Sequence, residues 1–202
     1  MPWADFLLAL TGGYAAYEFT KFAKGREGLK FLALASAACF FIFIEIAIII
    51  GSFFTSSAVV TVIDFIVEWG QIISLSFILS SLVLLIRETR PSYEQFPLLY
   101  GALPFLIIIS YFFALESELI RRWLFFIYQG GALVVGLLMY GSKVYQQKRY
   151  KMVLIGISGL FLAYLMYWTI PILRNNYPTS WKLVLLAGIV TTAYGYKSAV
   201  KK

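Results

Sequence analysis

Long apolar stretches separated by short polar segments dominate the pattern of the chain. Seven such stretches occur, at residues 3–19, 29–51, 57–86, 96–115, 122–141, 152–173 and 178–196. A helix needs about 20 predominantly apolar residues to cross the hydrocarbon core of a bilayer. The pattern therefore predicts an all-α, polytopic membrane protein in which residues 1–202 form a single transmembrane domain, a seven-helix bundle.

The first stretch is short, and Gly12 and Gly13 each weaken a helix by about 1 kcal/mol relative to Ala. The distribution of Lys and Arg nevertheless favours its crossing, because these residues stay on the cytoplasmic side of short loops. If all seven stretches cross, 13 of the 17 basic residues lie on one side and four on the other. This split predicts an N-terminus outside, a cytoplasmic C-terminus and residence in the plasma membrane.

Composition excludes several functional classes. Hydrophobic residues make up 61% of the chain and charged residues 13%, which is not the composition of a soluble domain. The chain has no histidine and only one cysteine, Cys39, so it has no histidine-ligated haem or zinc, no Fe–S cluster and no Ser-His or Cys-His catalytic pair. An intramembrane aspartyl protease would need a second aspartate beside Asp64. We expect no enzymatic activity, no cofactor and no metal site.

The basic clusters have two interpretations, nucleic-acid binding or orientation in the membrane. Their alternation with the predicted spans, without an aromatic and basic surface, favours orientation together with attraction to anionic lipids. We expect the lipid bilayer as a partner and no nucleic acid.

Three acids lie within the predicted spans, Glu45, Asp64 and Glu68. A charge at mid-bilayer costs at least ~2.5–3.5 kcal/mol, so such residues face protein or water and are functional candidates. Asp64, Glu68 and Gln71 follow an i, i+4, i+7 spacing, which predicts one stripe facing the bundle. Glu45 and Asp64 are roughly level, about 10 Å from the outer ends of their helices, and would pair to share a proton or bind a cation.

Four further residues complete a predicted pocket in the outer half of the bundle. Lys182 and Gln129 lie near the same level, and Lys182 would neutralise one of the acids. Tyr167 and Trp168 belong to an aromatic face of the sixth span. The alternative is structural: aromatic residues in the membrane interface, a Lys182 that extends outward, and acids that only hydrogen-bond neighbouring helices.

Parts of the chain resemble the seven-helix sensor modules of bacterial histidine kinases. The likeness is carried by Glu68-Trp69-Gly70-Gln71, Arg87-Glu88-Thr89-Arg90-Pro91 and Gln146-Gln147-Lys148-Arg149-Tyr150. It implies a receptor-like or accessory module, and the lack of an output domain in these 202 residues implies action through a protein partner. The acids leave open a small proton- or cation-coupled transporter or ion channel. The pairs Gly12-Gly13 and Gly130-Gly131 also leave open a repeat of spans one to three in spans five to seven.

The charge split predicts that a reporter active only in the cytoplasm, fused after Lys202, will be active. The same reporter fused before Met1 will be silent. The measurement is reporter activity normalised to the amount of fusion protein in the membrane. A silent C-terminal fusion at normal expression would contradict the topology.

Overall fold

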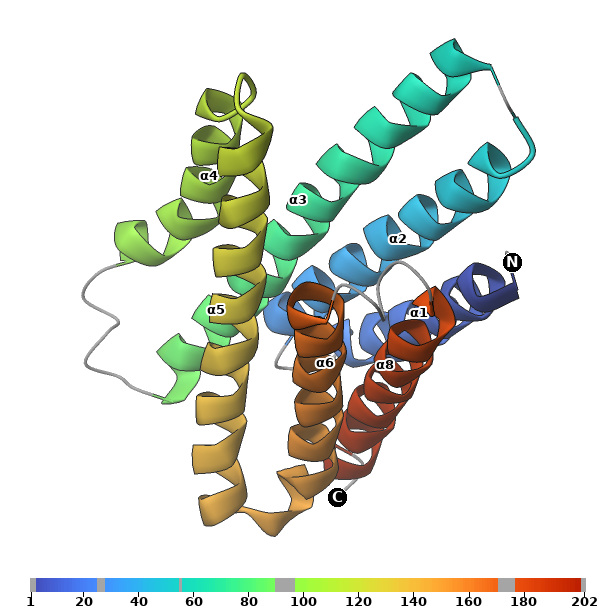
Figure 1. Ribbon diagram of the computed structural model, residues 1–202. Helices are drawn as coiled ribbons and strands as arrows, with labels where there is room; N and C mark the ends of the chain where they lie inside the picture. The colour runs from blue at the N-terminus through green and yellow to red at the C-terminus, as the bar shows by residue number, and fades with distance from the viewer. Residues whose placement is uncertain (1–2, 25–27, 55, 90–96, 171–176, 201–202) are drawn as a thin grey trace.

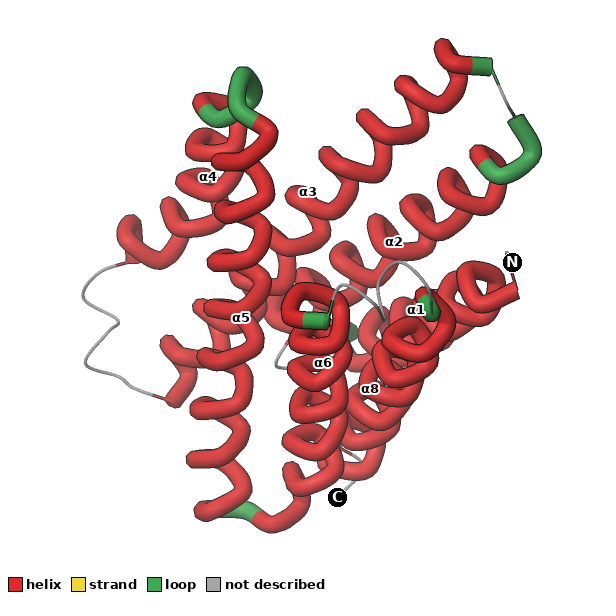
Figure 2. The backbone as a smooth tube through the Cα atoms, viewed as in Figure 1, coloured by secondary structure: helices red, strands yellow, loops and turns green. Residues whose placement is uncertain are grey.

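The computed structural model describes residues 3–24, 28–54, 56–89, 97–170 and 177–200 (Figure 1). These residues form seven α-helices and one 3-10 turn, without a strand (Figure 2). The elements are α1 (Trp3–Ala23), α2 (Gly28–Gly51), α3 (Ser57–Thr89), α4 (Pro97–Phe113), α5 (Glu118–Gln146), η2 (Lys148–Tyr150), α6 (Lys151–Thr169) and α8 (Pro178–Val200). The predicted all-α class is confirmed. The boundaries expected at residue 96 and at 171–173 lie outside the described residues.

Five helical segments are long and apolar enough to cross a membrane. They are Gly28–Gly51, Ser57–Arg87, Glu118–Gln146, Lys148–Thr169 and Pro178–Val200. The other two helices do not meet the same standard. α1 carries Asp5, Glu18 and Lys21, and α4 has 17 residues, about 26 Å against a hydrocarbon core of ~30 Å.

Local signals explain where two of the helices begin. Ser117 precedes α5, and its Oγ accepts a 3.4 Å hydrogen bond from the Ile120 backbone N–H, satisfying one donor of the first turn. Pro178 is the first residue of α8, a position where its missing N–H costs nothing and its fixed φ suits the helix.

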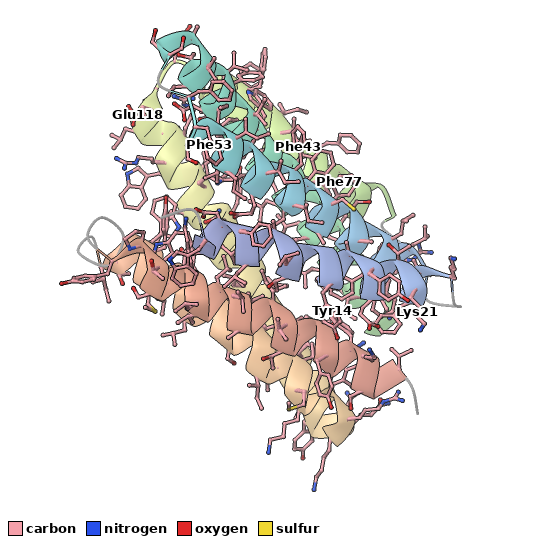
Figure 3. All side chains as sticks on the ribbon, turned by 90° about the vertical axis from the view of Figure 1, so that its right-hand side faces the viewer. Tyr14, Lys21, Phe43, Phe53, Phe77 and Glu118 are labelled. Atoms are coloured by element: carbon pink, nitrogen blue, oxygen red, sulfur yellow. The ribbon has the colours of Figure 1, made fainter. Side chains whose placement is uncertain are left out.

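Six of the helices contact one another in a closed ring. Following the chain, α1 contacts α2, α2 contacts α3, α3 contacts α5, α5 contacts α6, α6 contacts α8, and α8 returns to α1. α4 lies outside the ring against α3 and α5 (Figure 1). Large apolar side chains on the outside, among them Phe43 and Phe53, are exposed as expected for helices solvated by lipid (Figure 3).

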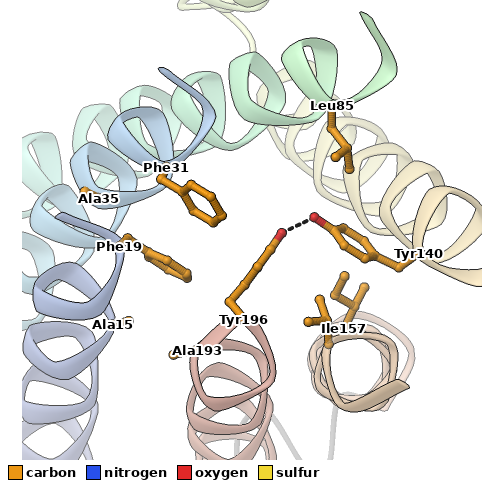
Figure 4. Packing of buried hydrophobic residues seen from close by; sticks show 10 residues of the cluster. Ala15, Phe19, Phe31, Ala35, Leu85, Tyr140, Ile157, Ala193 and Tyr196 are labelled. Carbon is orange, nitrogen blue, oxygen red and sulfur yellow. Dashed lines mark hydrogen bonds between the residues drawn. The ribbon is translucent and has the colours of Figure 1, made fainter. Parts of the chain in front are cut away.

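The ring is tightly packed where α1, α3, α5 and α8 end, which we call the basic end. All six ring helices contribute to a buried cluster there, consisting of Ala15, Phe19, Phe31, Ala35, Leu85, Tyr140, Val153, Ile157, Ala193 and Tyr196 (Figure 4). Its centre is a hydrogen bond between the Tyr140 and Tyr196 hydroxyl groups, and Phe19 and Phe31 each meet the Tyr196 ring edge-on. At the other end of the bundle, which we call the opposite end, α2 and α3 diverge from α5 and α6 (Figure 1).

Glycines bring α6 and α8 into backbone contact. A Cβ atom on Gly195 would lie 2.5 Å from the Val153 backbone nitrogen, and one on Gly156 would lie 2.5 Å from that of Thr192. Small residues permit such close approach in membrane bundles. Gly131 on α5 differs, because a Cβ there would meet nothing within 4 Å.

This contrast predicts opposite effects for two matched substitutions. Gly195→Ala will destabilise the protein by roughly 1–3 kcal/mol, because backbone atoms of α6 cannot move aside as a side chain can. Gly131→Ala will be neutral or stabilise by up to about 1 kcal/mol through helix propensity. Thermal unfolding of the detergent-solubilised protein, followed by circular dichroism, measures both. Equal changes in Tm for the two variants would contradict the packing.

Candidate functional site

The residues expected to form one outer pocket fall into separate groups. Glu45 and Lys182 belong to an ionic cluster at the opposite end, and Glu68 belongs to a different ion pair. Gln129, Tyr167 and Trp168 form an aromatic contact between α5, α6 and α8. Asp64 and Gln71 are exposed on α3.

The first group joins α1, α2 and α8. Lys182 Nζ donates a hydrogen bond to Asp5 Oδ1 in an ion pair between α8 and α1. Glu45 on α2 interacts electrostatically with both partners, and its side chain contacts Asp5. Lys182, predicted to neutralise an acid of the second or third span, instead binds the carboxylate of Asp5 on α1 and interacts with Glu45 electrostatically.

Burial makes this cluster energetically important. Asp5 is 7% exposed and Glu45 6% exposed, and a buried charge is tolerated only when paired and hydrogen-bonded. Glu45 Oε2 has no hydrogen-bond partner among the described residues. The cluster thus contains one ammonium group for two carboxyl groups.

A cavity of about 160 Å³ adjoins this cluster. Asp5 and Lys182 line it together with Ser52 and Thr179, and its apolar walls are Ala4, Ile48 and Pro178. Glu45 lies on α2 three residues before Ile48; it is not among the residues that line the cavity, and its side chain contacts Asp5. The cavity is at the opposite end of the bundle, where α1 and α8 begin and α2 ends.

The second group uses Glu68 to join α3, α4 and α5. Arg121 Nη1 lies 2.6 Å from Glu68 Oε1, and the Tyr111 hydroxyl group donates to the same oxygen. Tyr111 is fully buried, with its ring edge-on to Trp69 and Phe125. Glu68 thus faces the protein as expected, but its charge is used in holding α4 against the ring.

The third group is aromatic. Trp168 Nε1 donates a 3.1 Å hydrogen bond to Gln129 Oε1, which links α6 to α5. The Tyr167 ring lies between Trp168 and Trp181, with a centroid distance of 5.0 Å to Trp181 on α8. These contacts place the predicted aromatic face of α6 in helix packing, apart from the ionic cluster.

The expectation that Asp64, Glu68 and Gln71 form one stripe facing the bundle is wrong for Asp64 and Gln71. The predicted depth of Asp64 assumes that the membrane begins at Ser57. α3 has 33 residues, roughly 50 Å, and so exceeds the ~30 Å hydrocarbon core by several turns. Asp64 is exposed on α3, and Glu45 is directed to Asp5 rather than to Asp64.

Sequence reasoning missed the acids of α1. Asp5 stands at the N-terminal edge of the first predicted span, yet it lies on one helical face with the buried residues Leu8, Gly12 and Ala15. Glu18, 3% exposed, accepts a 2.5 Å hydrogen bond from Lys197 Nζ. The register of Asp5 with small and apolar residues is the signal that would have revealed its burial.

Asp5 and Glu18 each bind a lysine of α8, which makes α1 and α8 a parallel pair joined near both ends. Lys197, expected to belong to the basic surface, is therefore held by an acid of α1.

Among the described residues, no group of three or more His, Cys, Asp or Glu side chains is placed to hold a metal ion.

Comparisons with known proteins give no match: no family model, no curated protein and no solved structure is significantly similar to this chain.

The Glu18–Lys197 pair predicts a non-additive pair of substitutions. Lys197→Met leaves the buried Glu18 carboxylate without its partner and will lower the Tm. Adding Glu18→Leu removes the orphaned charge and will restore most of the loss. Thermal unfolding in detergent measures both variants. A double variant less stable than Lys197→Met would show that the pair does not carry this role.

Proposed function

We propose that this chain is a seven-span integral membrane protein of the plasma membrane, with its N-terminus outside and its C-terminus in the cytoplasm. Five apolar helices and the 13-to-4 split of basic residues support this topology. α1 gains support from its ion pairs with α8, which lie 13 residues apart along α1, about 20 Å. A helix held along that length to an apolar span crosses with it, and its carboxylates are hidden from lipid.

The same reasoning applies to α4. The described ends of α3 and α5 both lie at the basic end, so the chain must return to the opposite end between them, and α4 is the helix that does so. The contacts of Glu68 with Tyr111 and Arg121 fix it against α3 and α5.

As its function, we propose a non-enzymatic, receptor-like sensor or accessory subunit that acts through a protein partner. One observation carries this proposal: the bundle has a cavity lined by ionisable side chains at the opposite end, whereas its basic end is closed by ten packed residues from six helices. This arrangement is suited to binding at one face rather than to open passage through the bundle. The basic end would contact anionic lipids and the partner.

A second function has its own support. Glu45 Oε2 is buried without a partner among the described residues, and intramembrane acids of this kind form proton and cation pathways. A small proton- or cation-coupled transporter is therefore the alternative. It would require the closed cluster around Tyr140 and Tyr196 to open during each cycle.

Flux measurements separate the two functions. We expect proteoliposomes of the purified protein to show no uptake of protons, Na⁺ or K⁺ above protein-free liposomes under an imposed gradient. Glu45→Gln will instead change association with the native partner, measured by cross-linking in the original membrane, whereas Asp64→Asn, at an exposed position, will not. Saturable uptake that Glu45→Gln abolishes and Asp64→Asn preserves would establish the transporter.

A further inference from the structure

A groove of about 390 Å³ runs between α3 and α4. Described residues of α3 line it from Ile73 to Arg87, and Pro104, Phe105 and Ile108 of α4 form its other wall. α4 lies outside the ring of helices, and the Phe105 side chain is 67% exposed. The groove therefore opens toward the surrounding bilayer and not toward the interior of the bundle.

Along its described lining, the groove has no free hydroxyl donor. Ser76 Oγ donates to Ile72 O at 2.9 Å, and Pro104 O lies 3.5 Å from the same hydroxyl group. Ser80 Oγ donates to Ser76 O at 2.8 Å. The residues between these serines and the basic end, such as Leu84, are apolar. Such a lining accommodates a hydrocarbon chain, whereas a polar solute would lose its hydration without gaining hydrogen bonds.

Arg87 is the one charged residue of the described lining, and it lies in the last turn of α3, at the basic end. Its side chain is exposed and forms no ion pair with any other described residue. A guanidinium group binds a phosphate group through two parallel hydrogen bonds. A positive charge at the end of an apolar groove is thus complementary to a lipid that carries a phosphate headgroup above its acyl chain.

The dimensions of the groove match one lipid chain. From Ile73 to Arg87 it extends along 14 residues of α3, about 21 Å at ~1.5 Å per residue. One leaflet of a bilayer is about as thick, half of ~40–45 Å with headgroups included. The volume divided by this length gives a cross-section of about 19 Å², whereas a helix of ~10 Å diameter needs about 80 Å². A partner helix therefore cannot enter the groove.

We infer that this groove binds one acyl chain of an anionic phospholipid from the leaflet at the basic end, with the headgroup phosphate paired to Arg87. The inference deepens the proposed function, in which the basic end contacts anionic lipids, and rests on it for assigning that leaflet to the cytoplasm. An acyl chain gains little by moving from the bilayer into an apolar groove, so the groove positions the lipid and the guanidinium group selects it. An anionic lipid is preferred because the phosphate of a zwitterionic lipid already has a cation of its own.

Lipid titrations of the delipidated full-length protein in a neutral detergent, followed by native mass spectrometry, test the site. We expect one phosphatidylglycerol to bind per protein, about tenfold or more tightly than phosphatidylcholine with the same acyl chains. Glycerol 3-phosphate, which has the phosphate without the chains, will not compete at equal concentration. Equal affinity for the two lipids would overturn the inference. Competition by glycerol 3-phosphate would do the same, because it would show a headgroup site that does not use the groove.

Two arginines of the basic end distinguish a site from general electrostatic attraction. Arg87→Gln will lower the affinity for phosphatidylglycerol about tenfold or more, because a charged hydrogen-bond donor is lost. Arg149→Gln is the matched control and will leave the affinity nearly unchanged, since Arg149 is exposed at the same end, donates to Gln147 and is not in the groove lining. Equal losses in the two variants would indicate diffuse attraction to anionic lipid and overturn the inference.

Ser80→Leu tests the groove itself. The larger side chain fills part of the space, and the hydrogen bond it removes lies within α3. We expect weaker binding of phosphatidylglycerol without a lower Tm in lipid-free detergent. Unaltered lipid affinity in this variant would overturn the groove as the binding site. A wild-type dimer that Ser80→Leu dissociates without changing lipid affinity would assign the groove to a second copy instead. The proposed function is tested separately, because binding in detergent depends neither on the reporter fusions nor on the flux measurements.

Discussion

Pairing of buried charge is the constraint on which this bundle depends. α1 carries Asp5 and Glu18 on largely buried positions, and lipid offers such carboxylates no solvation. α8 supplies a lysine to each, so the two helices lie side by side in parallel. This contact joins the first and last helices and closes the ring; a helix with unpaired acids in the same place would instead be expelled from the bilayer or left partly solvated.

Different interfaces of the ring are held by different forces. α6 and α8 approach through glycines, while the basic end is filled by aromatic rings around Tyr196. α4, which lies outside the ring, depends on a polar contact to Glu68. Since apolar side chains gain little by moving from lipid to a helix interface, close packing and hydrogen bonds determine which helices meet.

The sequence allowed the helices, and the burial of Glu45, to be predicted, because both follow from hydrophobic length and the cost of intramembrane charge. It did not reveal the partners. Helical periodicity places Glu45 on a face but does not say which helix covers that face, so Asp64 was expected where Asp5 lies. The predicted depth of Asp64 was wrong for a related reason. Counting residues from the end of a helix gives the depth in the membrane only when the helix begins at the membrane boundary, and α3 does not begin there.

The polarity of α2 relates the buried charges to the proposed orientation. Its buried Lys30 lies toward the basic end, and its buried Glu45 lies 15 residues further along, toward the opposite end. The buried charges of α2 therefore follow the charge distribution of the loops, with the positive charge toward the basic end and the negative charge toward the opposite end. In the proposed orientation, Asp5 and Glu45 lie on the outer side of the closed cluster at the basic end. A pathway through the membrane would need a further acceptor beyond Glu45, and two other acids are already bound, Glu18 to Lys197 and Glu68 to Arg121 and Tyr111. This placement of charge supports the proposed receptor-like function over the transporter.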